Sequence, residues 1–427
     1  MSLYFIEGPA GTGKTTRLFQ KLERTLEKCP LAEHQQVLAL TKMHGSRRRM
    51  DGRLRTISGL RRRYRCCTAD SFAWSIVRRW RTLARRKSAL ELAEDDYDHV
   101  CSLAGDLLGE EIVSRWVIRV FPIVVVDEFQ DCKGGQLAMV SSLSRLAICI
   151  VAADDFQDLD STEANPGVAW ARTNGETQSL SDIHRTSASG LLEASRAIRG
   201  GGDIPRKGVG LTVLGARNQN VGASFVSRNL TWWSNCADIA VLTPVRPSGS
   251  PFVRDLVARV EAKPIGDRSF GPHPIPWEAS QEEEFDRLIR GLGLPDDPDA
   301  EVGRNGLSFS DVRGPQQGLR NWIERETRVA GRTKFTAGEI RSEARRIHQR
   351  SRAYRRVSGG GVRAMTIHQA KNREFHSVIV LWPYQVVRPI QRQRRLLYNA
   401  ITRAKYRVLV VVQNPSRLDQ PPFVVRS

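Results

Sequence analysis

The most constraining feature of this chain is the glycine-rich run Gly-Pro-Ala-Gly-Thr-Gly-Lys-Thr-Thr at residues 8–16. An apolar run at residues 3–6 comes directly before it, and Leu18, Leu22 and Leu26 follow with the spacing of one helix face. This order of strand, loop and helix is the context in which the pattern G-x-x-x-x-G-K-[ST] forms a phosphate-binding loop. A glycine turn with an incidental lysine is the plain alternative, and the flanking elements disfavour it. The run therefore predicts an α/β domain that binds a nucleoside triphosphate.

The side chains and N–H groups of this loop have expected partners. The glycines let the backbone bend so that its N–H groups face a phosphate, and the N-terminus of the following helix adds partial positive charge. Lys14 is expected to reach the β- and γ-phosphates, and Thr15 is expected to hold Mg²⁺. The predicted nucleotide-binding residues of the loop are Gly8, Pro9, Ala10, Gly11, Thr12, Gly13, Lys14, Thr15 and Thr16.

Two carboxylates follow a second buried strand. Residues 123–126 are Ile-Val-Val-Val, and Asp127 and Glu128 come directly after them. The carboxyl edge of a parallel sheet is where α/β proteins bind ligands. We therefore expect Asp127 to complete the Mg²⁺ shell and Glu128 to orient or deprotonate an attacking water.

Further apolar runs predict more buried parallel strands. They lie at residues 37–41, 146–152, 239–243, 378–381 and 408–412.

The charge of the chain favours a polyanionic partner. Lysine and arginine outnumber aspartate and glutamate by 66 to 46, which gives a net charge of +20. Residues 42–87 hold sixteen of these cations against two acids, with Phe72, Trp74 and Trp80 between them. Cations contact phosphates and aromatic rings stack on bases, so this basic run favours single-stranded nucleic acid. A solvated basic helix face is the alternative.

The cysteines and the apolar runs indicate the compartment. Seven cysteines form no C-x-x-C pair and no cluster with histidine, as expected for core thiols in a reducing compartment. The predicted first strand begins at residue 3 and leaves no room for a signal peptide, and no apolar run reaches membrane-spanning length. The sequence predicts a cytoplasmic protein with no membrane partner.

From residue 127 the sequence reads Asp-Glu-Phe-Gln-Asp, and here it resembles the UvrD/Rep group of superfamily 1 helicases. Members of this group are two-domain, ATP-driven motors that translocate on single-stranded DNA. Segments similar to the other motifs of the group follow in family order, at residues 38–41, 68–73, 153–157, 184–186, 365–375 and 394–404.

The resemblance implies two RecA-like P-loop NTPase domains with parallel sheets, a small helical insertion in the second, and ATP between the two. It places the first domain at residues 1–176, the second at 177–270 and 358–427, and the insertion at 271–357. In the site it implies Gln157 as γ-phosphate sensor, Arg185 and Arg403 as arginines reaching across the cleft, and His184 and Glu374 at the base and ribose. Together with the basic run it predicts nucleic-acid contacts at Thr41, Lys42, Arg61, Arg62, Arg63, Asp70, Ser71, Phe72, Thr366 and His368.

The sequence departs from the family pattern around the base. Seven residues precede Gly8, so the upstream glutamine motif that reads adenine is missing, and His184 replaces a tyrosine. With no polar group identified to reject guanine, GTP is expected to be hydrolysed within about an order of magnitude of ATP. Asn372 replaces a glycine, and because Asn tolerates a positive φ the bend there is expected to survive.

The chain is also small for this family. About 50 residues separate Phe72 from Asp127, and about 180 separate Arg185 from Thr366, so the accessory insertions are trimmed. The resemblance favours a DNA-dependent ATPase and 3′-to-5′ helicase in DNA repair or phage defence. The alternative, by analogy with helicase-like subunits that work beside a nuclease, is a nucleotide-gated sensor of DNA ends that controls a partner nuclease. An RNA motor is a third reading.

If the basic run tracks a phosphate backbone, stimulation of ATP hydrolysis by single-stranded DNA should weaken steeply with salt, because each cation contact releases a counterion. Charge reversal at Arg61, Arg62 and Arg63 should weaken binding with little change in sequence preference. The measurement is ATP turnover against DNA concentration at several salt concentrations. Binding that does not change with salt would contradict the prediction.

Overall fold

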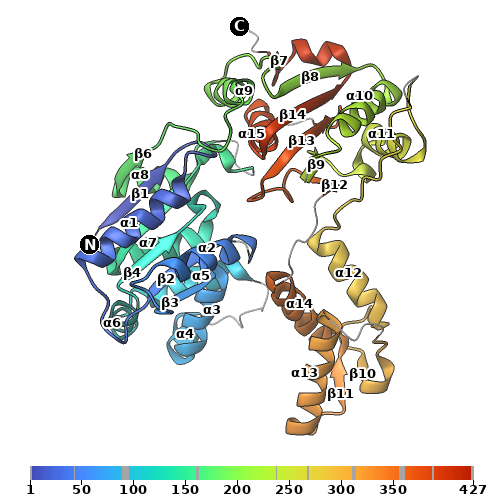
Figure 1. Cartoon of the computed structure of the whole chain (residues 1–427). Coiled ribbons are helices and arrows are strands. Elements are labelled where there is room, and N and C mark those ends of the chain that lie inside the picture. Colours follow the sequence, from blue (N-terminus) through green and yellow to red (C-terminus); the bar gives the residue numbers. More distant parts are fainter. Residues whose placement is uncertain are drawn as a thin grey trace. The chain divides into compact units, whose positions relative to one another are not determined.

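The chain forms two compact units in this computed structural model: residues Met1–Trp277 with Gly359–Ser427, and residues Glu278–Ser358 (Figure 1). The structure describes residues 2–42, 44–88, 96–159, 163–236, 238–266, 269–309, 314–354, 361–386 and 389–424. The first unit contains two six-stranded sheets, and the second contains a small two-stranded sheet.

The first sheet is parallel throughout and has the strand order β3-β2-β4-β5-β1-β6. Its strands are β1 (Leu3–Glu7), β2 (Val37–Thr41), β3 (Tyr64–Thr68), β4 (Ile123–Val126), β5 (Ile148–Ala153) and β6 (Glu176–Ser179). The helices that accompany it are α1 (Lys14–Lys28), α2 (His44–Thr56), α3 (Ala69–Arg79), α4 (Arg81–Lys87), α5 (Tyr97–Leu107), α6 (Glu111–Val120), α7 (Gly134–Leu146) and α8 (Pro166–Asn174).

Both faces of this sheet are buried, which explains why its central strands are almost wholly apolar. Side chains of β4 alternate between two cores: Val124 and Val126 pack with α3, α5, α6 and α7, whereas Ile123 and Val125 pack with α1 and α2. Because the strands are parallel, β1, β2, β4 and β5 all end at one edge of the sheet. That edge therefore carries the P-loop, Thr41, Asp127 and Asp154.

The second sheet has the order β12-β9-β13-β14-β8-β7 and is parallel except for β7, which pairs antiparallel with β8. Its strands are β7 (Lys207–Gly208), β8 (Leu211–Ala216), β9 (Asp238–Thr243), β12 (Gly361–Thr366), β13 (Phe375–Trp382) and β14 (Ala404–Gln413). Its helices are α9 (Ser189–Gly200), α10 (Gln219–Trp232), α11 (Pro251–Ala262) and α15 (Ile390–Ile401). Core residues from α9 and α15 pack on one face, and core residues from α10 and α11 pack on the other.

Two parallel-rich α/β sheets with helices on both faces confirm the predicted fold class and are consistent with a pair of RecA-like domains. The sequence-based domain limits stay a proposal. Strand β6 pairs with β1, so the first sheet extends to Ser179. Within the described residues, no helix is both long enough and apolar enough to cross a bilayer.

The second unit contains more than helices. It holds α12 (Gln281–Leu292), α13 (Pro315–Ala330) and α14 (Ala337–Tyr354), together with the antiparallel strands β10 (Glu301–Gly303) and β11 (Lys334–Thr336). The sequence pattern predicted no strand here, because three-residue strands are too short to show an alternation. Phe335, Leu319 and Ile340 contribute to a core that belongs to this unit alone.

Phe72 makes a stability prediction possible because its side chain is fully buried and packs edge-on against Phe121, with ring centroids 6.0 Å apart. Phe72→Ala should lower the free energy of unfolding by about 3–5 kcal/mol, because it leaves a cavity in the core of the first sheet. Denaturant unfolding followed by circular dichroism measures this change. Arg85→Ala, at an exposed position of α4, is the control and should change stability by less than about 0.5 kcal/mol. An unchanged midpoint for Phe72→Ala would contradict the burial.

Candidate functional site

The glycine-rich run forms a tight loop between β1 and α1. Gly11 and Gly13 have φ values of 83° and 79°, which favour glycine over other residues. A Cβ on Gly11 would also lie 2.6 Å from the Cβ of Arg185, so the loop can be approached closely by the segment after β6. Gly13 caps α1, which places the positive end of the helix beside the loop.

Lys14 is buried at the start of α1 with its ammonium turned back to the loop. Its Nζ donates to the carbonyl oxygens of Gly8 and Pro9 at 3.0 and 2.9 Å, and it lies 4.0 Å from Oδ2 of Asp154. Burial lowers the pKa of Lys14, although the charge of Asp154 partly opposes this effect. The surrounding groups therefore neutralise the positive charge of Lys14 only in part, which leaves it able to attract a phosphate group.

Thr15 and Asp127 offer oxygen atoms of the kind that Mg²⁺ prefers. The Thr15 hydroxyl donates to Oδ2 of Asp127 at 3.0 Å, although the two residues are far apart in the sequence. Among the described residues no cluster of three or more His, Cys, Asp or Glu side chains is arranged to hold a metal. Mg²⁺ needs none, because it is commonly bound through one or two carboxylates together with substrate phosphates. The oxygen atoms of Thr15 and Asp127 therefore suit an Mg²⁺ ion that is bound together with a nucleotide.

Glu128 adopts a left-handed backbone conformation with φ 56°, which is uncommon for a residue other than glycine. Its Oε2 accepts from Nε2 of Gln130 at 2.7 Å, and the Oε1 of Gln130 in turn accepts from the backbone of Asp154 at 3.1 Å. Burial would raise the pKa of Glu128, but Lys14 and the bond from Gln130 outweigh it and lower that pKa. Burial and the Glu128 charge raise the pKa of the adjacent Asp127 to about 6.

Arg403 reaches this site from the C-terminal end of α15. Its Nη2 donates to Oε1 of Gln157 at 3.2 Å, and its Nε donates to the carbonyl oxygen of Asn399 at 3.1 Å. The side chain is buried, and within the described ranges no carboxylate forms an ion pair with it. Burial, followed by the charge of Arg185, lowers the pKa of Arg403 to about 10. The groups that bond this guanidinium are neutral. Its positive charge is therefore available to an anion such as a phosphate group.

Arg185 and Glu374 form an ion pair at 2.8 Å, and Arg185 also donates to the carbonyl oxygen of Thr402 at 2.8 Å. The backbone N–H of His184 donates to the carbonyl oxygen of Gly11 at 2.8 Å, and its exposed ring lies beside Gly13. The residues predicted from both domains are thus brought around the P-loop, with Arg185 held by Glu374.

Sequence reasoning assigned no role to the groups that join these residues. The hydroxyl of Tyr398 accepts from the N–H of Ala10 at 2.7 Å and donates to Asp154 at 3.1 Å. Arg199 of α9 binds the other oxygen of Asp154 at 2.5 Å. Tyr398 lies inside the last motif and could have been found there. Arg199 lies in no motif, so no sequence pattern indicated a role for it.

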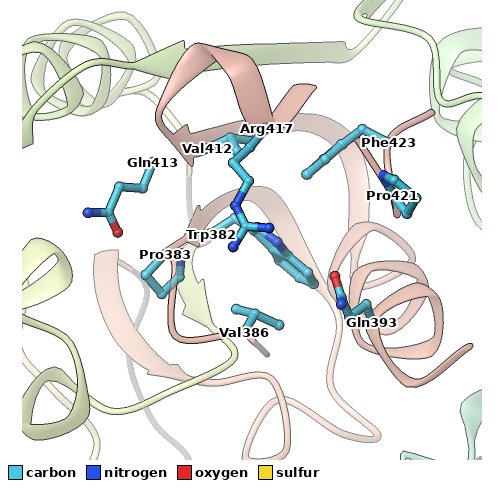
Figure 2. A pocket seen from close by; sticks show the side chains of 9 residues that line it. All are labelled: Trp382, Pro383, Val386, Gln393, Val412, Gln413, Arg417, Pro421 and Phe423. Carbon is cyan, nitrogen blue, oxygen red and sulfur yellow. The ribbon is translucent and has the colours of Figure 1, made fainter. Parts of the chain in front are cut away.

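A separate hollow lies at the carboxyl ends of β13 and β14. Figure 2 shows Arg417 pointing into it, with Trp382, Phe423 and Pro421 along its wall. None of the nine residues that line it carries a carboxylate, so it offers no metal ligand comparable to Asp127. None of its lining residues belongs to the predicted nucleotide site.

Two stretches of the sequence match models of helicase domains. Residues 2–108 match the UvrD/REP helicase N-terminal domain, and residues 361–411 match the UvrD-like helicase C-terminal domain. These two matches support a UvrD/Rep-like DNA helicase. The first match includes the P-loop and the second includes Glu374 and Arg403, so this helicase has family-defining segments on both sides of the cleft. Among curated proteins none matches its sequence significantly.

The structure separates the predicted DNA contacts of this helicase into accessible and internal ones. Arg61 and Arg62 are exposed in a turn, with φ values of 33° and 71°, and Ser71 is exposed at the start of α3. Thr366 and His368 are half-buried at the carboxyl end of β12, where Thr366 bonds Gln369. These residues stay predicted contacts.

The ring of Phe72 is fully buried in the core, where it presents no face on which a base could stack. Arg63 is bonded to three backbone carbonyl oxygens, including those of Leu31 and Gly59, and so holds the fold together here. The ammonium of Lys42 bonds the Asp131 carbonyl at 3.1 Å.

The remaining predicted contacts are also engaged within the fold. Thr41 is buried, and the Asp70 carboxylate accepts from Gln136 at 2.5 Å. Trp74 and Trp80, the aromatics between the basic residues, are partly buried against the core of the first sheet. The aromatic residues of the basic run therefore do not form an exposed stacking surface.

Asn372 has φ 63°, which confirms the expectation that asparagine preserves the bend at this position. Its side chain donates to the hydroxyl of Ser46 at 2.9 Å, and Arg49 donates to its carbonyl oxygen. One residue earlier, Lys371 forms an ion pair with Asp131 at 2.5 Å. This segment of the second domain therefore rests on the first.

The geometry around Glu128 generates a test. Glu128→Gln keeps the shape of the side chain but removes the base, so it should bind ATP normally and hydrolyse it about 10²–10⁴-fold more slowly. Equilibrium binding of a fluorescent ATP analogue and steady-state turnover measure the two effects separately. Glu33→Gln, at an exposed position, is the control. Near-normal turnover in Glu128→Gln would remove this residue from the catalytic role.

Proposed function

We propose that this helicase hydrolyses ATP with Mg²⁺ and uses the energy to translocate on single-stranded DNA, in the 3′-to-5′ direction. The observation that carries the proposal is the meeting of Arg403 from the second domain with Gln157 beside the P-loop of the first, at 3.2 Å. Neither domain alone contains this arrangement. Hydrolysis in such a site depends on how the two domains close.

Nucleotide binding would use groups that are already in place. N–H groups of the loop and the positive end of α1 would face the phosphates, and Lys14 would exchange two carbonyl oxygens for phosphate oxygens. Thr15 and Asp127 would hold Mg²⁺, whose chemistry is to neutralise charge on the phosphate oxygens. The ring of His184 is exposed beside Gly13, where it can stack on the base.

Hydrolysis requires a base and a cation on opposite sides of the γ-phosphate. Glu128 has a lowered pKa and is held by Gln130, so at neutral pH it is ionised and oriented to accept a proton from water. Arg403 would stabilise the charge that develops on the transferred group, and Arg185 would join it after leaving Glu374. The arginines act only when the cleft is closed, which couples the chemistry to domain motion.

One short segment supports the coupling of nucleotide to DNA. It begins with Thr366 at the carboxyl end of β12 and reaches Glu374 directly before β13. Because β12 and β13 run in the same direction, these two ends lie at opposite edges of the second sheet. A shift of Glu374 upon release of Arg185 would therefore move the segment that carries His368.

Polarity and pathway rest on the family resemblance. The direction of travel and a role in DNA repair or phage defence are carried over from the motifs, and exposed cations such as Arg61 and Arg62 supply the charge that a phosphate backbone needs. Single-stranded DNA, or the end of a duplex, is the proposed partner.

A nucleotide-gated sensor that controls a partner nuclease is the second candidate, and the small size of the first domain favours it. Helices α5 and α6, between the basic run and Asp127, contribute Val100, Leu103 and Val117 to the core of the first sheet. The described part of this stretch is therefore scaffold, and an accessory domain that could grip a duplex is missing from it. Each base-pair step costs about 1.4 kcal/mol of stacking, so opening needs such a grip.

The isolated chain should accordingly show strong ATP hydrolysis stimulated by single-stranded DNA and poor opening of long duplexes. Two assays distinguish movement from unwinding: displacement of streptavidin from a biotin at the 5′ or 3′ end of a single strand, and displacement of a complementary strand. A 3′-to-5′ translocase removes streptavidin faster from the 5′ end. Matched RNA strands serve as the comparison for substrate class.

Hydrolysis without displacement from either end would favour the sensor. Processive opening of long duplexes by the chain alone would contradict the expected weakness, and stronger stimulation by RNA would favour an RNA motor.

A further inference from the structure

The carboxylate of Asp154 is the most heavily engaged acidic group near the P-loop. It lies directly after β5 and is fully buried. Its Oδ1 accepts from Arg199 at 2.5 Å and from the N–H of Phe156 at 3.1 Å. Its Oδ2 accepts from Tyr398 and Gln157, each at 3.1 Å, and lies 4.0 Å from Nζ of Lys14.

Two cations compensate this carboxylate, because its other partners are neutral donors. Burial alone would raise the pKa of Asp154, but the charges of Lys14 and Arg199 outweigh it and hold that pKa below its ordinary value. The two cations differ in origin: Lys14 belongs to the P-loop, whereas Arg199 arrives on α9 from the second domain. A buried carboxylate without a compensating cation is costly. Loss of either Lys14 or Arg199 would therefore strengthen the attraction of Asp154 for the cation that remains.

Arg199 is well held in its place. Its guanidinium lies 5.6 Å from the ring centroid of Phe156 and 6.0 Å from that of Tyr398, and the two rings pack edge-on at 5.1 Å. Arg199 therefore meets Asp154 beside two aromatic side chains that restrict its rotamers, with the carboxylate fully buried and the Arg199 side chain 30% exposed.

Lys14 faces two competing anions once a nucleotide enters. To reach the phosphates it must weaken its attraction to Asp154. If Asp154 had no other cation, leaving it would expose an uncompensated buried charge, and the carboxylate would retain Lys14. Arg199 removes this competition because it satisfies Asp154 independently of the P-loop.

We propose that Arg199 is a positioning residue of the ATP site: by neutralising Asp154 from the second domain, it releases Lys14 to the phosphates of the incoming nucleotide. The inference rests on the proposed function of the P-loop as an ATP site. It implies that nucleotide affinity depends on the contact between α9 and the first domain, so closure of the cleft and release of Lys14 from Asp154 are linked.

The test is the dissociation constant of a fluorescent, slowly hydrolysed ATP analogue with Mg²⁺, measured on the full chain without DNA. Arg199→Gln should weaken binding about tenfold, because Lys14 is then held by Asp154. Arg196→Gln is the matched control: it makes the same change of charge on the same helix, at an exposed position. It should bind within about twofold of the wild type. Equal effects of the two substitutions would overturn the proposal.

A double-variant cycle separates release of Lys14 from a general loss of positive charge. In an Asp154→Asn background there is no carboxylate to compete for Lys14, so adding Arg199→Gln should no longer weaken binding. A simple field effect would instead add the same tenfold loss in both backgrounds, and that result would overturn the proposal. Where Arg199→Gln alone does not fold, a tenfold loss within the pair of chains that carry Asp154→Asn still overturns the proposal.

Failure of the proposed role of Arg199 and failure of the proposed motor function give different results. Nucleotide binding without hydrolysis stimulated by single-stranded DNA would contradict the motor while leaving the binding cycle intact. Additive effects in the cycle, with normal DNA-stimulated hydrolysis by the wild type, would contradict the role of Arg199 alone.

Discussion

The site depends on the compensation of charges that are buried between two α/β domains. A continuous chain of contacts runs from the N–H of Ala10 through Tyr398 to Asp154, and from there through Gln157 to Arg403. Buried polar groups without partners are costly, so these contacts constrain one another. The P-loop of the first domain is thereby joined to the last helix of the second. On the proposed function, a nucleotide bound at the P-loop would exchange contacts along this chain and so change how the domains are held.

Much of the fold could be predicted, because buried parallel strands are short, almost wholly apolar runs that are easily recognised in a sequence. The apolar runs predicted β2, β4, β5, β9, β13 and β14. Strand β6 was missed because its four residues are polar and exposed, as befits the edge of a sheet. The stretch around α5 carries several acidic residues, among them Asp96, Asp98 and Asp106. In the described part of it, however, Val100, Leu103 and Leu107 repeat with helical spacing and are buried, so a few apolar residues outweighed many charged ones.

The candidate site was predicted where its chemistry is local in the sequence. The glycine loop, Asp127 and Glu128 are recognisable because each follows a strand whose end fixes its place. Phe72 was assigned to DNA because it stands among arginines, yet α3 turns it inward while Arg78 and Arg79 face solvent. An aromatic residue in a basic run can belong to the apolar face of an amphipathic helix. Arg199 could not be predicted, because its meeting with Asp154 exists only after two separate domains have folded and come together.

We propose that the P-loop holds ATP and that arginines of the second domain complete its site. A crystal structure with a non-hydrolysable ATP analogue, Mg²⁺ and a short single strand of DNA tests it most directly. We expect Lys14 to leave the carbonyl oxygens of Gly8 and Pro9 for the phosphates, and Arg403 and Arg185 to bond oxygens of the γ-phosphate. A nucleotide bound away from the P-loop, or a γ-phosphate that neither arginine reaches, would contradict it.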